Sequence, residues 1–245
     1  MDWTKAKNIL IVALILTNLV LIFSYAQKDK TMASTSDSIL NDTIRHLESK
    51  DIFINTEVPK KYGRMPVLHV KYDKMDKDRV RVVIDAQVEI TSHPNNDEEI
   101  TQLAIEFLKK SGLYSKNVTF DRIDKKGDIT TVLFKNCIKD NIQIEDSYIL
   151  CDIKDGQVVN LERYWLKPIK YGKMKKQITP ASKALIKFSS MREGDEKMYI
   201  DDISLIYWLD SESFEGEALI SDTAFPTWKI TYNGDKVAYI VAHDQ

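Results

Sequence analysis

The stretch that decides the architecture of this chain is NILIVALILTNLVLIFSYA, residues 8–26. It contains no charged side chain, and as an α-helix it would be about 28 Å long. That length is enough to cross a hydrocarbon core of about 30 Å. The sequence therefore predicts a transmembrane helix over residues 8–26, and the rest of the chain works outside the cytosol or against a membrane.

The same stretch has some features of a secretory signal. The tripeptide at 24–26 has the small-x-small form of a cleavage site, and Lys5 and Lys7 form a short basic region. However, the apolar run at 9–23 reaches or exceeds the upper length of a signal's apolar region, about 15 residues, and carries a Thr-Asn pair at its centre. We therefore expect an uncleaved anchor, with a cleaved signal as the alternative.

The flanking charges predict the orientation of the helix. Lys5 and Lys7 precede it, whereas the lysines that follow, at 28–30, are diluted by an aspartate. Positive charge favours the cytosolic side of a membrane, so we expect a single-pass protein of the cell membrane with a cytosolic tail over 1–7. Residues 27–35 are expected to form a linker. Because the tail is too short to hold a domain, any message to the cytosol must pass through the helix or a partner.

Two faces of the predicted helix differ in chemistry. At 100° per residue, Asn18 lies on one face with Leu14 and Leu21, and Ala13 and Thr17 form a stripe of small residues about 120° away. A carboxamide in hydrocarbon seeks a hydrogen-bond partner, and small residues let helices approach closely. These five residues are the predicted partner-binding residues of the transmembrane helix. The alternative is that a single-pass anchor tolerates one asparagine and that small residues are common in apolar segments.

Composition excludes some classes of protein. The chain has 35 basic and 37 acidic residues, without the basic excess of a nucleic-acid binder, so no nucleic-acid partner is expected. The two cysteines, Cys137 and Cys151, are too few for a disulfide scaffold. A turn at 139–141 would place Cys137 opposite about position 143, which favours two unpaired, buried thiols over a bridge between them.

Hydrophobic periodicity predicts a helix and a hairpin in the first segment outside the membrane, residues 36–95. The apolar residues of 36–49 recur with helical spacing, and Ser36 or Asp37 is expected to cap this helix. Two runs rich in β-branched residues follow at 67–72 and 79–90, joined by a charged turn. They predict a hairpin with one solvated face.

The remainder reads as two similar units, at 96–166 and 178–242. The first unit has a helix at 98–110, closed by Gly112, and four strands, at 129–137, 142–145, 148–153 and 158–165. The second unit has a helix from 179 or 180 to 190 and four strands, at 203–209, 218–221, 227–232 and 236–242. Asp-Gly and Asn-Gly turns, the strongest hairpin signals, lie 78 residues apart at 155–156 and 233–234. The predicted fold class is α+β, with repeated helix-plus-antiparallel-sheet units after the transmembrane helix. Alternatively, such pieces recur in any α+β protein.

The basic segment at 167–176 joins the two units. It is expected to be a solvated linker. The alternative is a basic strip for an anionic cell-wall polymer, a lipid headgroup or an acidic partner.

A search for catalytic chemistry finds no recognisable site. The four histidines, at 46, 69, 93 and 243, have no second metal ligand at a recognised spacing, and the chain has no nucleophile motif and no glycine-rich phosphate loop. We therefore expect no catalytic, cofactor-binding or metal-binding residues and no enzyme activity.

Three stretches resemble a known family. MDWTKAKNI at 1–9, followed by LTN at 16–18, is similar to the YycI (WalI) family of Firmicutes; IEDSYI at 144–149 and PTWKI at 226–230 are similar to that family and to its sister YycH. The repeated unit also resembles the small PepSY-type module.

The resemblance implies a membrane-anchored regulator of the YycFG/WalRK two-component system, which controls cell-wall homeostasis. Its implied partners are the sensor histidine kinase YycG/WalK and a YycH-like protein, contacted through transmembrane helices and extracytoplasmic surfaces. The alternative function is a PepSY-like extracytoplasmic module that binds or inhibits a cell-wall hydrolase or protease.

Overall fold

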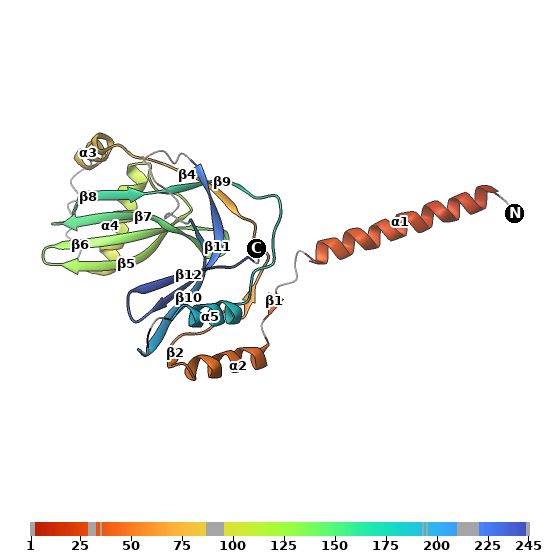
Figure 1. Cartoon of the computed structure of the whole chain (residues 1–245). Coiled ribbons are helices and arrows are strands. Elements are labelled where there is room, and N and C mark those ends of the chain that lie inside the picture. Colours follow the sequence, from red (N-terminus) through yellow and green to blue (C-terminus); the bar gives the residue numbers. More distant parts are fainter. Residues whose placement is uncertain are drawn as a thin grey trace.

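The structure, a computed structural model, describes residues 3–28, 33–34, 36–86, 96–192, 194, 196–209 and 221–243. It has an apolar N-terminal helix and a sheet-rich part that carries the other helices (Figure 1). The helices are α1 Trp3–Lys28, α2 Asp37–Glu48, α3 Lys77–Asp85, α4 Asp97–Lys110 and α5 Ala181–Ser190, with a 3-10 turn at Lys139–Asn141. The predicted α+β class is confirmed.

Ten of the twelve strands in the described residues form one sheet. Its order is β5-β6-β7-β10-β11-β4-β9, and β8, β2 and β12 pair with β7, β10 and β11. The remaining pair is β1 with β3. The strands are β1 Ala33–Ser34, β2 Ile52–Ile54, β3 Lys61–Tyr62, β4 Leu68–Tyr72, β5 Val118–Lys126, β6 Ile129–Ile138, β7 Ile142–Lys154, β8 Gln157–Tyr164, β9 Leu166–Tyr171, β10 Met198–Trp208, β11 Ser221–Tyr232 and β12 Lys236–Val241.

The sheet-rich part has two halves, each with its own core (Figure 1). We call residues 77–86 and 96–165 the α4 half, because α4 buries Phe107 and Leu108 on β5–β8. Residues 36–72 and 166–243 form the α5 half, in which α2 and α5 pack with β2, β4 and β9–β12 around Trp228; its core also takes in Ile138 and Ile144 from the ends of β6 and β7. The halves are joined where β7 and β10 run parallel.

Local sequence explains the start and end of α4. The side chain of Asn96 accepts a hydrogen bond from the Glu99 backbone N–H at 2.9 Å, and three acidic residues occupy the first turn. These features satisfy a free backbone donor and complement the positive end of the helix dipole. Gly112, at φ +70°, lies just beyond the helix in the left-handed conformation that glycine adopts without strain. This helix and its closing glycine were predicted correctly.

The other expected helices and the tight turns are also confirmed. Ser36 caps α2, and Pro180 precedes α5. Asp155-Gly156 and Asn233-Gly234 both have positive φ angles; the first pair forms a two-residue loop, as in a type I′ turn, and the second lies in the three-residue loop between Tyr232 and Lys236. The duplication of the two units stays a prediction.

The expected hairpin at 67–90 is wrong. Its first strand is present as β4, but β4 pairs with β9 on one edge and β11 on the other, so neither edge is open to a second hairpin strand. Residues 77–85 form helix α3 instead, which packs Val80 and Ile84, one helical turn apart, against the α4-half core. Val82, which a strand would have placed on the same face, is 65% exposed. The second strand's remainder, at 87–90, lies outside the described residues.

Several further strands were not predicted. The first part of the expected 167–176 linker is β9, whose residues 166–171 pair with β4. Strand β5 precedes β6, two residues of the expected 27–35 linker form β1, and the short strands β2 and β3 follow α2. Because β9 contains Pro168 and two lysines, its polar composition indicated a linker, but these residue types are also typical of an exposed sheet edge.

The two cysteines are unpaired, as expected. Cys137 lies opposite Gln143 in the β6–β7 ladder, while Cys151 lies opposite Val132. Cys151 is buried and Cys137 is half-buried, so the prediction of two buried thiols holds fully for Cys151 alone. Burial raises the pKa of Cys151 to about 12 and also raises the pKa of Cys137.

The histidines are dispersed as expected. His243 is buried with its Nε2 3.2 Å from the Met65 carbonyl, and the His69 Nδ1 lies 3.1 Å from the Thr223 hydroxyl. His46 lies in α2, and His93 is outside the described residues. Among the described residues, no group of three or more His, Cys, Asp or Glu is placed to hold a metal ion.

Candidate functional sites in α1 and around Glu145

Helix α1 is long and apolar enough to span a membrane over Ala6–Phe23, by length and composition. None of this window is buried against the rest of the structure; Leu14 and Leu21, for example, are 64% and 60% exposed. Exposed apolar surface costs about 25 cal/mol per Å² in water, so a helix of this kind requires an apolar environment. By these criteria α1 is a candidate membrane anchor or signal sequence.

The predicted partner-binding residues all lie exposed on α1. Ala13 and Thr17 are joined by a hydrogen bond of 2.9 Å from the threonine hydroxyl to the alanine carbonyl. This bond satisfies the hydroxyl within the helix. Lys7 is exposed at the start of α1, and Lys5 lies in the same first turns. Their roles in partner binding and topology stay predictions.

Asn18 differs from Thr17 in how its polar group is satisfied. Within the described residues of α1, the structure gives its carboxamide no hydrogen bond, and the side chain is exposed beside Leu14 and Leu21. An amide in hydrocarbon without a partner is costly, by about 2–7 kcal/mol depending on the reference state. A polar group on another helix would remove that cost.

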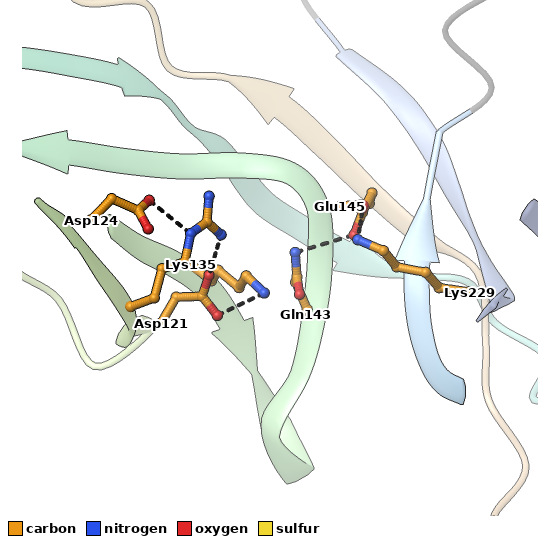
Figure 2. Close-up of polar contacts among 7 residues, drawn as sticks. Asp121, Asp124, Lys135, Gln143, Glu145 and Lys229 are labelled. Carbon is orange, nitrogen blue, oxygen red and sulfur yellow. Dashed lines mark hydrogen bonds and ion pairs between the residues drawn. The ribbon is translucent and has the colours of Figure 1, made fainter. Parts of the chain in front are cut away.

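A buried polar cluster joins the two halves (Figure 2). The Glu145 carboxylate, on β7, accepts hydrogen bonds from the Tyr239 hydroxyl at 2.9 Å and the Gln143 amide at 3.1 Å, and it pairs with the Lys229 ammonium. Lys229 and Tyr239 lie on β11 and β12 of the α5 half. Only 6% of the Glu145 side chain and 19% of the Lys229 side chain are exposed.

Strand register brings these groups together. Lys229 lies directly opposite Tyr239 in the β11–β12 ladder, so their side chains share one face of the sheet. Ile144 pairs in parallel with Tyr207 of β10, which places the adjacent Glu145 beside that face. The cluster therefore forms where the strands of the two halves meet.

The electrostatics of the cluster are those of a structural ion pair. Burial raises the pKa of Tyr239, and the neighbouring Glu145 carboxylate raises it further, so the phenol stays protonated and donates. Partial burial and Glu145 raise the pKa of Asp146, while Lys229 opposes that shift. With its oxygens held by three donors, the Glu145 carboxylate is suited to fixing the halves together.

A second group of charges in Figure 2 is a surface network. Asp121 on β5 accepts from Lys135 at 2.7 Å and from Arg122 at 3.0 Å, and Arg122 also contacts Asp124 at 2.9 Å. Because the Arg122 and Asp124 side chains are more than half exposed, such pairs contribute little to stability. We assign no function to this network.

The Glu145 cluster was missed from the sequence, although two of its residues stand in quoted motifs. Glu145 lies in IEDSYI, and Lys229 lies in PTWKI. The only local signal is a charged residue among apolar ones in each motif: Glu145, with Asp146 beside it, and Lys229. Their pairing depends on a register between strands that are 84 residues apart.

Known proteins resemble this chain mainly over its sheet-rich part. The family model described as YycI protein matches residues 27–242. No curated protein matches the chain. Among solved structures, the Bacillus megaterium YpeB C-terminal domain is similar, at 11% identity and a TM-score of 0.39, over 76% of this chain and 70% of that one. The chain therefore belongs to the YycI family, a non-catalytic family with a regulatory role in the YycFG system.

Proposed function

We propose that this chain is a non-enzymatic regulator held in the cell membrane by α1, with its sheet-rich part outside the cytosol. It binds a YycG/WalK-like sensor histidine kinase together with a YycH-like partner and modulates the kinase. The observation that carries the proposal is the unburied apolar surface of Ala6–Phe23, which needs a membrane or other helices around it. Family membership supplies the regulatory setting.

The proposed orientation rests on charge. Lys5 and Lys7 lie before the span, and the positive charge at 28–30 is partly cancelled by Asp29. The positive-inside rule then favours a cytosolic N-terminus. In this orientation the kinase and the regulator share the membrane and the space outside it, and contact is available in both.

Two faces of α1 suit two helical partners. Ala13 and Thr17, with the threonine hydroxyl already bonded to the helix, form a smooth small-residue face for close packing. Asn18, beside Leu14 and Leu21, offers a donor and an acceptor to a polar group on another helix. Such a bond contributes roughly 1 kcal/mol, which is about a five-fold change in association.

Co-purification of the full-length chain from membranes in mild detergent tests the proposal. We expect the kinase and the YycH-like protein to be recovered with it. Asn18→Leu keeps the helix apolar, so it should lower recovery of one partner about five-fold and alter expression of the kinase's target genes. Leu19→Ile, one position along, is the matched control and should change neither. Ala13→Leu should instead weaken the contact made by the small-residue face.

Two outcomes would contradict the proposal. If Asn18→Leu and Ala13→Leu both leave association and output unchanged, α1 is an anchor alone and the helix contacts are not used. If the full-length chain recovers a cell-wall hydrolase or protease and no kinase, the alternative of an inhibitory module is supported instead.

A further inference from the structure

A pocket of about 490 Å³ lies at the edge of the α4 half, between the segment leading into α3, the loop after α4, the end of β8 and the start of β9. The described residues that line it include five cationic side chains and one anionic side chain: Lys74, Arg79, Lys116, Arg163, Lys167 and Asp73. The whole chain has a net charge of −2. The pocket is therefore a local concentration of positive charge on a nearly neutral protein.

Arg163 forms the base of the pocket and is fixed in place. Its side chain is 8% exposed, and its two terminal nitrogens donate to the Asp73 carbonyl at 2.7 Å and to the Asp73 carboxylate at 2.6 Å. Its guanidinium carbon lies 5.6 Å from the centre of the Trp165 ring. The third guanidinium nitrogen, Nε, is buried and has no hydrogen-bond partner among the described residues. Most buried donors are paired, whereas Arg163 still has an unused N–H at the pocket lining.

The rest of the pocket also suits a negatively charged ligand. Lys74, Arg79, Lys116 and Lys167 are exposed, so their ammonium and guanidinium groups are free to move toward a bound anion. The loop after α4 is tied to the end of that helix, since the backbone N–H groups of residues 113 and 114 both donate to the Leu108 carbonyl at 2.8 and 2.9 Å. Repulsion among the five cations is relieved when an anion binds.

We propose that this pocket binds a soluble ligand that carries a phosphate group. An excess of four positive charges suits a multiply charged anion better than a single carboxylate, and arginine and lysine are the usual phosphate ligands in proteins. The volume is that of a small-molecule site and fits a polyol or sugar phosphate. The same phosphate could be presented by a lipid headgroup, but α3 and β8 lie across the molecule from α2, the first helix after the predicted span (Figure 1). A soluble source is therefore favoured. The proposal does not depend on contacts made by α1.

Titration calorimetry on the full-length chain in neutral detergent tests this site. The probes are inorganic phosphate and glycerol 3-phosphate, at low salt and up to about 10 mM, a range that covers a millimolar dissociation constant. We expect saturable binding that weakens as salt is added. Lys116→Gln and Lys167→Gln should each weaken it about five-fold, because each removes one exposed cation from the rim.

Matched variants separate the site from general charge. Lys170→Gln removes an exposed lysine from the same strand, β9, outside the pocket lining, and should leave binding unchanged. Arg163→Lys keeps the charge and lacks Nε, so it should weaken binding about ten-fold or more. If that variant fails to fold, the two rim variants still decide the question.

Three results would overturn the proposal. The first is no saturable binding of either probe. The second is equal weakening by Lys170→Gln and Lys167→Gln, which would indicate non-specific attraction. The third is binding to vesicles of phosphatidylglycerol and phosphatidylcholine with no binding of the soluble probes, which would assign the charge to a membrane surface.

Discussion

Replacing Glu145 with glutamine removes the charge that holds Lys229 at the junction of the two halves. The Glu145 side chain is 6% exposed and the Lys229 side chain is 19% exposed, so solvent screens this pair weakly. Breaking a buried ion pair by removing one partner costs about 3–5 kcal/mol. We take the lower value, about 3 kcal/mol, because the glutamine side chain keeps an oxygen that Tyr239 can donate to. In a domain of this size, about 3 kcal/mol corresponds to a fall in melting temperature of about 6–12 °C.

Urea unfolding of the full-length chain in detergent, followed by tryptophan fluorescence, measures this loss. The double variant Glu145→Gln/Lys229→Met removes both charges and should regain most of the stability, leaving a loss of about 1 kcal/mol. The control is Asp128→Asn, which breaks the exposed pair with Lys154 at 3.9 Å and should cost less than about 0.5 kcal/mol. A loss for Glu145→Gln no larger than that of Asp128→Asn, or a double variant less stable than the single one, would refute the reasoning.

Three other outcomes are expected. A reporter fused after Gln245 should be active only outside the cytosol, and recovery of a soluble form beginning at Gln27 would show a cleaved signal instead. Burial lowers the pKa of His243, so the folded chain binds this proton more weakly than the unfolded chain. The contribution of His243 to the free energy of unfolding should therefore be fully present above a pH of about 6.5 and be lost as the pH falls below it. In urea unfolding, His243→Asn should lose less stability over the same pH range than the unaltered chain. Thiol labelling at neutral pH should leave Cys151 unmodified until the chain unfolds and find no bridge to Cys137, whereas labelling in the native state would contradict its burial.

Elements specified by neighbouring residues were predictable from the sequence. Helix α4 carries its own cap at Asn96 and its own end at Gly112, and the Asn233-Gly234 turn fixes the β11–β12 hairpin. The turn at 139–141 likewise predicted the position opposite Cys137. In each case the physical cause lies within a few residues along the chain.

Elements specified by distant partners were not predictable in this way. Residues 79–85 alternate as a strand would, yet the edges of β4 are already occupied by β9 and β11, and the apolar groups of α3 are buried on a different core. The ion pair of Glu145 and the pocket around Arg163 also depend on contacts between residues that are distant in the sequence. Arg163 meets Asp73 across 90 residues of chain, which no local pattern specifies.

The path of the chain through the sheet also sets an order of folding. Tyr72, at the end of β4, lies opposite Leu166, at the start of β9. The chain therefore leaves the α5 half and returns to it at neighbouring points in space, and the α4 half is an insertion between them. The α4 half is contiguous and is complete once residue 165 has emerged. The α5-half core instead joins Leu47 to Trp228, which is synthesised 181 residues later. During synthesis, α2 and β4 must therefore wait without their core until almost the whole chain has been made.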